Sequence, residues 1–300
     1  MKKVIVLIST IITISGCSTT YNLTAIGERF DALTKITDFD KICIYPNGGD
    51  SGENLVFSVR ESDGASHNIY MKNNVLSRAI TQKTSGPNFN LSPNYCKAND
   101  NIVFQYWDKT NFDIYYINAS KGKAITQITN TEDNEYNPAW SNDGRIVVFE
   151  RGAPPRYYIE TKGSFLSGLK SKTIEVTSNQ IWLKNTETGE LSMLGEGSFP
   201  KISPDGKSIA YIKYDIIEPS LIEIFSMSEV VGTLWMMSID GSEPKQLTNR
   251  NLGSASMPNW SPDCKHIVFQ LTKKNKEDSD IYTIDSDGEA LKQYTTNESN

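Results

Sequence analysis

The sequence predicts an all-β fold, and three observations support this. One short phrase recurs, as "NPAWSNDGRIVVF" from Asn137 to Phe149, "FPKISPDGKSIAYI" from Phe199 to Ile212 and "MPNWSPDCKHIVF" from Met257 to Phe269. Runs rich in β-branched and aromatic residues follow each phrase, bounded by Gly, Pro, Asn and Asp as strands usually are. Related runs recur along most of the chain. Four short strands that repeat in this way are typical of a β-propeller, in which each blade covers its neighbours.

Each repeat has the same order of elements. The Pro-x-Trp-Ser phrase supplies one strand and a turn. The next strand is predicted at 55–57, 102–104, 146–149, 209–211 and 267–269. A further strand is predicted at 68–70, 113–115, 180–182, 233–235 and 280–282, and the last strand in runs such as "AITQIT", "LSMLG" and "PKQLT".

The spacing of the repeats bears on the number of blades. Equivalent residues Phe57, Phe104, Phe149, Tyr211 and Phe269 are 47, 45, 62 and 58 residues apart. Five repeats are complete, and a strand-like piece at Asp31–Thr37 precedes them. Two arrangements stay open. In one, the ring has five blades and the N-terminal piece caps an edge. In the other, which we prefer, the ring is near six-bladed geometry and one blade is deficient.

The turn Ser203-Pro204-Asp205-Gly206 has a structural explanation. Proline presets φ, the aspartate bonds the local backbone, and glycine accepts positive φ. We therefore expect a hairpin turn, with cation binding by the aspartates as the alternative. In the last copy Cys264 occupies the glycine position. Trp140 and Trp260 are expected to fill gaps between blades, with ligand stacking as the alternative.

The first residues indicate export. Lys2 and Lys3 precede a short apolar run, and Ile14-Ser15-Gly16-Cys17 resembles the lipobox of bacterial lipoproteins. An ordinary secretory signal with an incidental cysteine is the alternative. The predicted organisation is a signal peptide at 1–16, a lipidated linker at 17–30 and the propeller at 31–300. Ser18 after the cysteine implies, by the usual sorting rule, a periplasm-facing outer-membrane anchor, with the cell surface or inner membrane as other possibilities.

The recurring phrases, each followed by an Ile-Tyr or Leu-Trp strand and a Leu-Thr-like strand, resemble the WD40-like propeller repeats of the TolB family. The resemblance covers about residues 30 to 296. In TolB the propeller binds the peptidoglycan-associated lipoprotein, which implies a protein or peptide partner of the cell envelope here. TolB also has an N-terminal α/β domain and no lipid anchor. The chain departs from TolB in both respects, so it is better described as a TolB-like propeller lipoprotein.

Composition and motifs argue against several functions. The net charge is −6 and no basic block occurs, so nucleic acid is not an expected partner. No Gly-x-Ser-x-Gly elbow is present, and His67 and His266 lie near strands of different blades without a nucleophile motif. We expect no enzyme, cofactor or metal. The alternative is a carbohydrate-active or other hydrolytic propeller, which a close carboxylate pair with a shifted pKa at the axial mouth would favour.

The three cysteines after Cys17 are expected to form no disulfide. Repeat alignment matches Cys43 with Pro258, at the start of an inner strand, whereas Cys96 and Cys264 fall at the turn ends of theirs. The start of an inner strand and the turn end of another are too far apart for a bridge. The turns of Cys96 and Cys264 belong to non-neighbouring blades.

Two long insertions predict the binding face. They span about 151–179 and 215–232 and separate the second and third strands of consecutive blades, so both should emerge on one face. Long loops in compact domains are usually functional or disordered, and these are apolar. They form either a lid over the channel mouth, a partner-binding site or a membrane contact. The candidate partner-binding residues are Tyr157, Tyr158, Phe165, Leu166, Leu221, Ile222, Phe225 and Met227.

Overall fold

The computed structural model describes residues 41–48, 54–64, 66–74, 79–122, 124–152, 161–162, 170–171, 179–217, 229–274 and 278–295. Within these residues almost every element is a β-strand, and the one helical element is a short 3-10 turn, η1 (Arg250–Leu252). The predicted signal peptide, the lipidation site Cys17 and the strand-like piece at Asp31–Thr37 lie outside the described residues.

The strands form five antiparallel blades of four strands, as the repeats predict. The first blade contains β1 (Cys43–Gly48), β2 (Leu55–Arg60), β3 (His67–Lys72) and β4 (Thr81–Gln82). The second contains β5 (Phe89–Cys96), β6 (Asn101–Trp107), β7 (Phe112–Asn118) and β8 (Ile125–Gln127). The third contains β9 (Glu135–Trp140), β10 (Ile146–Arg151), β13 (Gln180–Asn185) and β14 (Leu191–Glu196). The fourth contains β15 (Ser198–Ile202), β16 (Ser208–Ile217), β17 (Glu229–Ser238) and β18 (Lys245–Gln246), and the fifth β19 (Ser254–Trp260), β20 (His266–Thr272), β21 (Ser279–Asp285) and β22 (Lys292–Gln293).

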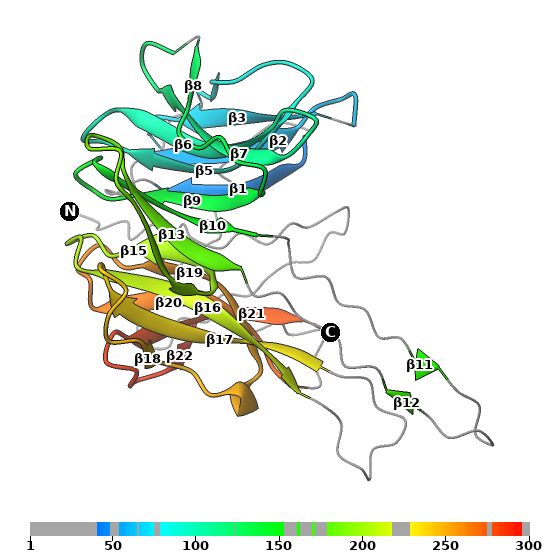
Figure 1. Cartoon of the computed structure of the whole chain (residues 1–300), viewed down its shortest axis with the longest axis vertical. Coiled ribbons are helices and arrows are strands. Elements are labelled where there is room, and N and C mark those ends of the chain that lie inside the picture. The colour runs from blue at the N-terminus through cyan, green and yellow to red at the C-terminus, as the bar shows by residue number, and fades with distance from the viewer. Residues whose placement is uncertain are drawn as a thin grey trace.

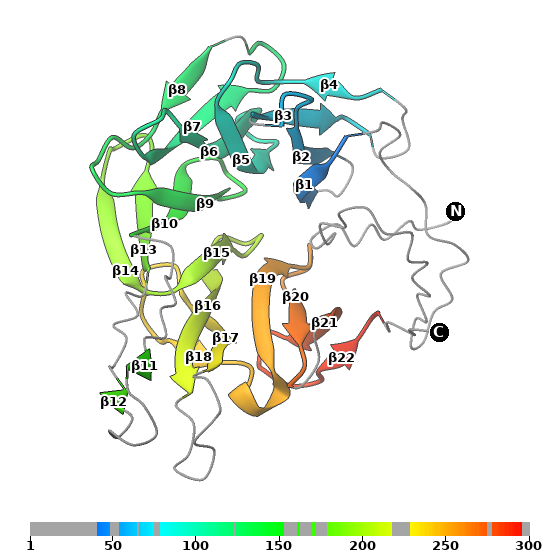
Figure 2. The same cartoon turned by 90° about the vertical axis from the view of Figure 1, so that its right-hand side faces the viewer.

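The blades are arranged around a common centre, with β1, β5, β9, β15 and β19 innermost (Figures 1 and 2). Each of the strands β5, β9, β15 and β19 also packs against the preceding blade. Figure 2 shows that the first and fifth blades stand apart. The described residues thus form five blades in an open arrangement, and the number of blades stays a prediction.

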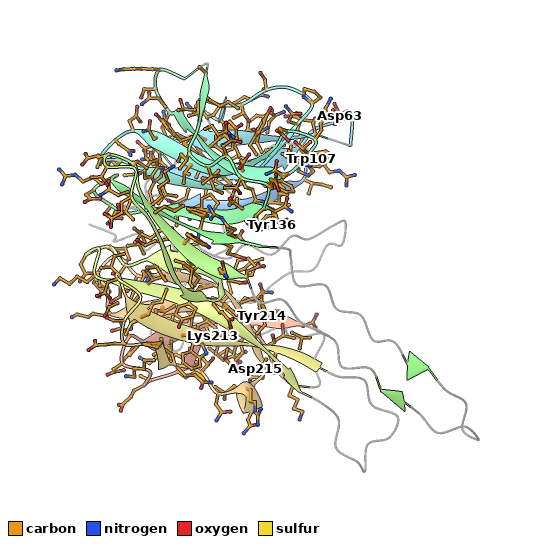
Figure 3. All side chains as sticks on the ribbon, viewed as in Figure 1. Asp63, Trp107, Tyr136, Lys213, Tyr214 and Asp215 are labelled. Carbon is orange, nitrogen blue, oxygen red and sulfur yellow. The ribbon has the colours of Figure 1, made fainter. Side chains whose placement is uncertain are left out.

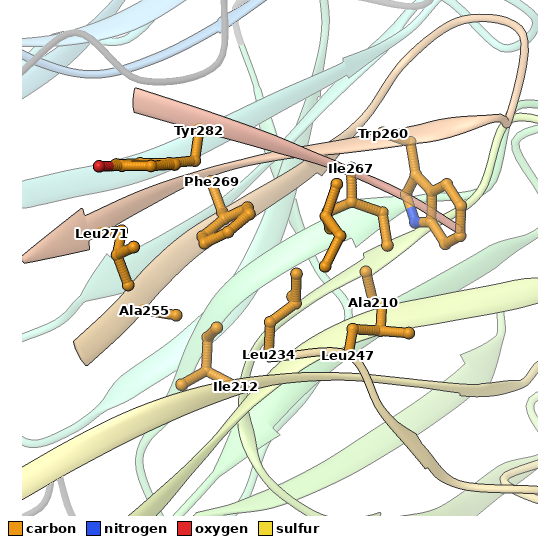
Figure 4. Packing of buried hydrophobic residues seen from close by; sticks show 11 residues of the cluster. Ala210, Ile212, Leu234, Leu247, Ala255, Trp260, Ile267, Phe269, Leu271 and Tyr282 are labelled. Carbon is orange, nitrogen blue, oxygen red and sulfur yellow. The ribbon is translucent and has the colours of Figure 1, made fainter. Parts of the chain in front are cut away.

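The hydrophobic core is divided among the blade junctions, because a lone blade cannot bury both of its faces. Between the fourth and fifth blades, for example, Ile212 and Leu234 pack against Phe269 and Leu271 (Figure 4). Burying each such side chain stabilises the fold by about 1.5–3 kcal/mol. Trp140 and Trp260 lie in two of these junctions with 6% and 9% of their surface exposed, which confirms their predicted role.

The recurring turns adopt one geometry in three blades. In each, the first serine accepts a hydrogen bond at its carbonyl from the N–H at the glycine position, and its hydroxyl contacts the turn aspartate at 2.5–2.6 Å. The glycine position has φ of +74° at Gly144 and Gly206 and +61° at Cys264. The turn is therefore the predicted hairpin, and Cys264 adopts a conformation that usually favours glycine.

A second recurring feature was not predicted. The residue before proline in every inner strand has positive φ, between +49° and +54°, and the register shifts there by a bulge, as at Tyr45, Asn137 and Met257. The bulge aligns Pro46 with Pro258, so the predicted match of Cys43 with Pro258 is wrong by three residues. The structure joins no two of Cys43, Cys96 and Cys264, and the absence of a disulfide among them stays a prediction.

The two ends of the strands define two faces of the propeller. Turns between the first and second strands of each blade, such as Ser141–Gly144, lie on one face, here called the turn face. Connections between the second and third strands lie on the opposite face, here called the insertion face. Both long insertions belong to the insertion face, because they connect β10 to β13 and β16 to β17. Figure 1 shows β11 (Thr161–Lys162) and β12 (Lys170–Ser171) projecting from this face.

Candidate functional site

The structure describes the bases of the two insertions. The first contains the short hairpin β11–β12, and the second is an extension of β16 and β17, which pair continuously from Ser208 with Ser238 to Ile217 with Glu229. All eight predicted partner-binding residues, at 157, 158, 165, 166, 221, 222, 225 and 227, lie outside the described residues. Their role remains a prediction.

On the same face, the described residues form a continuous row of rings, here called the aromatic row. It consists of His67, Phe89, Trp107, Phe112 and Tyr136. Successive ring centroids are 5.2, 5.0, 6.4 and 5.3 Å apart. All five side chains are half-buried. The row therefore spans the first three blades and is partly open to solvent.

Strand register explains why these rings meet. His67 pairs with Phe89 across the one parallel bridge between the first two blades, Phe89 pairs with Trp107, and Trp107 pairs with Phe112. Directly paired residues on one face of a sheet have neighbouring side chains. The N–H of Phe112 donates to Asn134 Oδ1 at 2.9 Å, which holds the start of β7 beside the loop that leads to Tyr136.

Two cations lie over tryptophan rings in the third and fourth blades. The guanidinium of Arg151 lies 4.2 Å from the ring centroid of Trp182, and the ammonium of Lys213 lies 4.5 Å from that of Trp235. Both cations are at the bases of the two insertions. Trp107, Tyr136, Lys213, Tyr214 and Asp215 are labelled along the insertion side of the molecule in Figure 3.

A pair of carboxyl groups, Asp113 and Glu135, lies beside the aromatic row at the junction of the second and third blades. Thr129 Oγ1 is 3.3 Å from Asp113 Oδ1 and 2.9 Å from Glu135 Oε2. Thr131 Oγ1 donates to Glu135 Oε1 at 2.5 Å, and Arg151 Nε lies 3.1 Å from the same oxygen. Glu135 is fully buried and Asp113 is 4% exposed.

The pKa of Glu135 in this pair is raised. Burial and the hydrogen bond with Asp113 raise the pKa of Glu135 to about 7, against the opposing bonds from Thr131 and Thr129. Thr129 has one hydroxyl proton for two carboxyl groups, which favours a proton on Glu135, whereas Arg151 beside it favours the ionised form, so burial decides the direction of the shift. Thr129 Oγ1 accepts a hydrogen bond from the N–H of Ile114. A protonated Glu135 can also donate to Thr129 Oγ1, while the Thr129 hydroxyl donates to Asp113. Such a group could supply acid or base chemistry only if a substrate reached it.

The neighbouring junction shows the structural role of these positions. Asn68 and Asn90 occupy the equivalent places between the first and second blades, where Asn90 Nδ2 lies 3.3 Å from Asn68 Oδ1. Thr84 takes the place of Thr129 there, donating to Asn68 and accepting from the N–H of Ile69. The carboxyl pair is thus an ionisable version of a recurring blade-to-blade contact.

The histidines form no nucleophilic site in the described part of the chain. His266 Nδ1 lies 2.7 Å from Asp285 Oδ1 on the turn face, away from the aromatic row. His67 belongs to the aromatic row, and burial lowers its pKa. Within the described residues no three His, Cys, Asp or Glu side chains are grouped so that they could hold a metal ion. The described residues also contain no helix of the length and hydrophobicity needed to cross a membrane.

Comparison with known proteins identifies the fold. No family model matches the sequence, and no curated protein matches it. The structure of TolB from Acinetobacter baumannii superposes with a TM-score of 0.62 and 16% identity, over 86% of this chain and 55% of that one. TolB from Agrobacterium tumefaciens gives 0.61 and 15%, over 85% and 81%. Oligogalacturonate lyase from Vibrio parahaemolyticus gives 0.52 and 16%, over 92% and 72%.

These likenesses establish a β-propeller similar to that of TolB, as the repeats predicted. The chain spans about half the length of the A. baumannii protein. At such low identity the comparisons define the fold and leave the activity open.

The aromatic row was not predicted from the sequence. Its signal was present, because Trp107 ends one strand and Phe112 starts the next, so both belong to the insertion face. Tyr136 and Phe89 stand near the starts of inner strands, at the same end. Only the contact between blades shows that these rings join into one surface.

Proposed function

We propose that this protein is an interaction module of the cell envelope, which binds a protein or peptide across its insertion face. The observation that carries the proposal is the aromatic row, half-buried and continuous over three blades. Aromatic residues are enriched at protein interfaces, where a few of them usually dominate the affinity. The neighbouring insertions, with their eight candidate residues, would enlarge the contact.

The arrangement of the rings favours a protein partner over a sugar. His67 and Phe89 stack with an angle of 24° between their planes, and the other rings tilt against their neighbours. Their faces are thus directed partly at one another, which leaves fewer open ring faces for a sugar to stack on. Ring edges and the neighbouring side chain of Asn134 suit apolar side chains and main-chain groups of a peptide.

The proposed location is the periplasmic side of the outer membrane, through a lipid on Cys17. The order of charged, apolar and small residues before that cysteine supports it. Mass spectrometry of the native N-terminus tests this part of the proposal. A mature chain that begins at lipid-modified Cys17 supports it, and a start elsewhere or an unmodified thiol contradicts it.

The binding proposal is tested by replacing Trp107 and Tyr136 with serine, singly and together. Partners crosslinked in native membranes are then recovered and compared with those of the wild type. A hot-spot residue contributes 2 kcal/mol or more, so each variant should reduce recovery at least tenfold in a titration. Tyr294→Ser, a half-buried tyrosine outside the row, is the matched control. Unchanged recovery from the double variant would refute the proposal.

A second candidate function is carbohydrate cleavage with Glu135 as acid or base. The raised pKa of Glu135 favours it, and a lyase is among the structural neighbours. The burial of the carboxyl pair and its equivalence to Asn68 and Asn90 weigh against it. Turnover of oligogalacturonate that Glu135→Gln abolishes would support this function. Absence of turnover by the wild type at high enzyme concentration would leave the interaction module as the better account.

A further inference from the structure

The outer strand of the third blade differs from the other four. The strand β14 has six residues, whereas β4, β8, β18 and β22 have two or three. Proteins usually keep exposed sheet edges short, or block them with lysine or proline, because an edge can pair with another chain. The sequence of β14, "LSMLGE", contains neither residue. Figure 2 shows β14 at the rim of the molecule.

Two residues of β14 direct their main-chain groups away from β13, its one paired strand in the described residues. The N–H of Asn185 donates to the carbonyl of Glu190 at 2.9 Å, so Glu190 bonds toward β13. In an antiparallel ladder successive residues alternate between bonding toward and away from the partner strand. The main-chain groups of Leu191 and Met193 therefore point outward, and in the described part of the chain no other segment bonds them.

The side chains of the same two residues are exposed. Leu191 is 40% and Met193 53% accessible, the latter being the most exposed large hydrophobic side chain in the described residues. Both belong to one side of the sheet, since they pair with Lys184 and Trp182. Leu194, by contrast, packs into the core between the third and fourth blades. The strand thus combines an open edge with an apolar strip.

We infer that the edge of β14 docks an extended segment of a partner protein, which adds a fifth strand to the third blade. Main-chain hydrogen bonds would supply affinity and alternate side chains would supply specificity. Exposed carboxylates of Glu190 and Glu196 flank the strip at its two ends. The segment that fits is therefore apolar at alternate positions and basic at both ends.

The same charges disfavour a second copy of this chain. Antiparallel pairing of β14 with itself, centred on Met193, would place Glu190 opposite Glu196 twice. Like charges directly opposite one another across two strands are destabilising. A basic partner converts both of these contacts into attractions.

The probes are two capped fluorescent peptides, Lys-Val-Thr-Val-Thr-Val-Lys and the same sequence with glutamates at both ends. Their binding is measured by fluorescence anisotropy at low salt. The wild type should bind the lysine peptide at least tenfold more tightly than the glutamate peptide. The double variant Glu190→Lys, Glu196→Lys should reverse this preference. Failure of the wild type to bind either peptide at millimolar concentration would overturn the inference.

Proline tests the edge itself. Met193→Pro removes an outward N–H and leaves the bonds to β13, so it should abolish peptide binding with little loss of stability. Ser192→Pro removes an inward N–H and should destabilise the blade, as the control for strand geometry. Binding that persists in a folded Met193→Pro variant contradicts the inference.

Hydrogen exchange on the wild type gives a measurement that needs no variant. The lysine peptide should slow exchange at Leu191 and Met193, and unchanged exchange at both would contradict the inference. Sedimentation tests whether a second copy of this chain occupies the edge instead. A wild-type dimer that is lost in Met193→Pro would assign the edge to that second copy. The variant Trp107→Ser should bind the peptide normally, which keeps this surface separate from the aromatic row.

Discussion

The turn face and the insertion face of the propeller are built from the same strands and differ in what is repeated. On the turn face, Ser141, Ser203 and Ser261 each begin a turn of the same geometry, with an aspartate two residues later. On the insertion face, equivalent positions hold different residues, such as the Asn68–Asn90 contact of one junction and Asp113–Glu135 of the next.

This difference separates folding from function. A feature that recurs from blade to blade serves a need that the blades share, namely closing a hairpin or covering a neighbour. A feature that occurs once, such as the aromatic row or a long insertion, is not required by the repeat. We therefore expect substitutions at recurring positions to affect stability, and substitutions at unique exposed positions of the insertion face to affect binding.

The largest expected effect on stability is at Trp140. This side chain fills the junction between the second and third blades near the turn face, and Trp140→Ala should cost about 3–5 kcal/mol of unfolding free energy. Trp107→Ala, at the half-buried insertion end of its strand, should cost less than half as much. Chemical denaturation of both variants measures the two values. Equal losses of unfolding free energy in the two variants would contradict the expected difference between the faces.

The next effect concerns the carboxyl pair. Because the pKa of Glu135 is raised from 4.5 to about 7, the folded state binds a proton that the unfolded state has released in this interval. Its contribution to stability is present below pH 4.5 and is lost as the pH rises through 7, by on the order of 3 kcal/mol.

The variant Glu135→Gln should remove that contribution to the pH dependence. Urea denaturation between pH 4 and 8 measures it, with Glu132→Gln, an exposed carboxyl in the same loop, as the control. The stability difference between variant and wild type should shift in favour of the variant with rising pH. A difference that stays constant over this range would show that the pKa of Glu135 is not raised on folding.

The smallest effects are expected within a single turn type. Gly206 has φ of +74° with open space around its Cα, so Gly206→Ala should cost about 1–2 kcal/mol through backbone strain alone. Cys264 has φ of +61° at the same position, so Cys264→Gly should stabilise by up to about 1 kcal/mol. Thermal unfolding checks the two signs. Destabilisation by Cys264→Gly would mean that the cysteine side chain contributes more than its strain costs.

Much of the fold was predictable because the turn face repeats in sequence. The Ser-x-Asp-Gly phrase located the hairpins, and Trp140 and Trp260 located the junctions. The first blade was misaligned because Gly48 stands where those blades have tryptophan, so that the guiding signal at Pro46 was overlooked. The aromatic row and the carboxyl pair were missed for a different reason. Trp107 and Phe112 are joined by a short connection, but the other contacts of the row and the carboxyl pair join residues about 20 positions apart across strands or blades, which no local pattern encodes.

We expect the insertion face to bind the partner and the turn face not to bind it. Photo-crosslinking amino acids placed singly at Phe112, on the insertion face, and at Asp143, on the turn face, test this expectation in native membranes. The account predicts one discrete crosslinked partner from position 112 that is lost when Trp107→Ser is added, and none from position 143. Equal crosslinking of the same partner from both positions, or from position 143 alone, would contradict it.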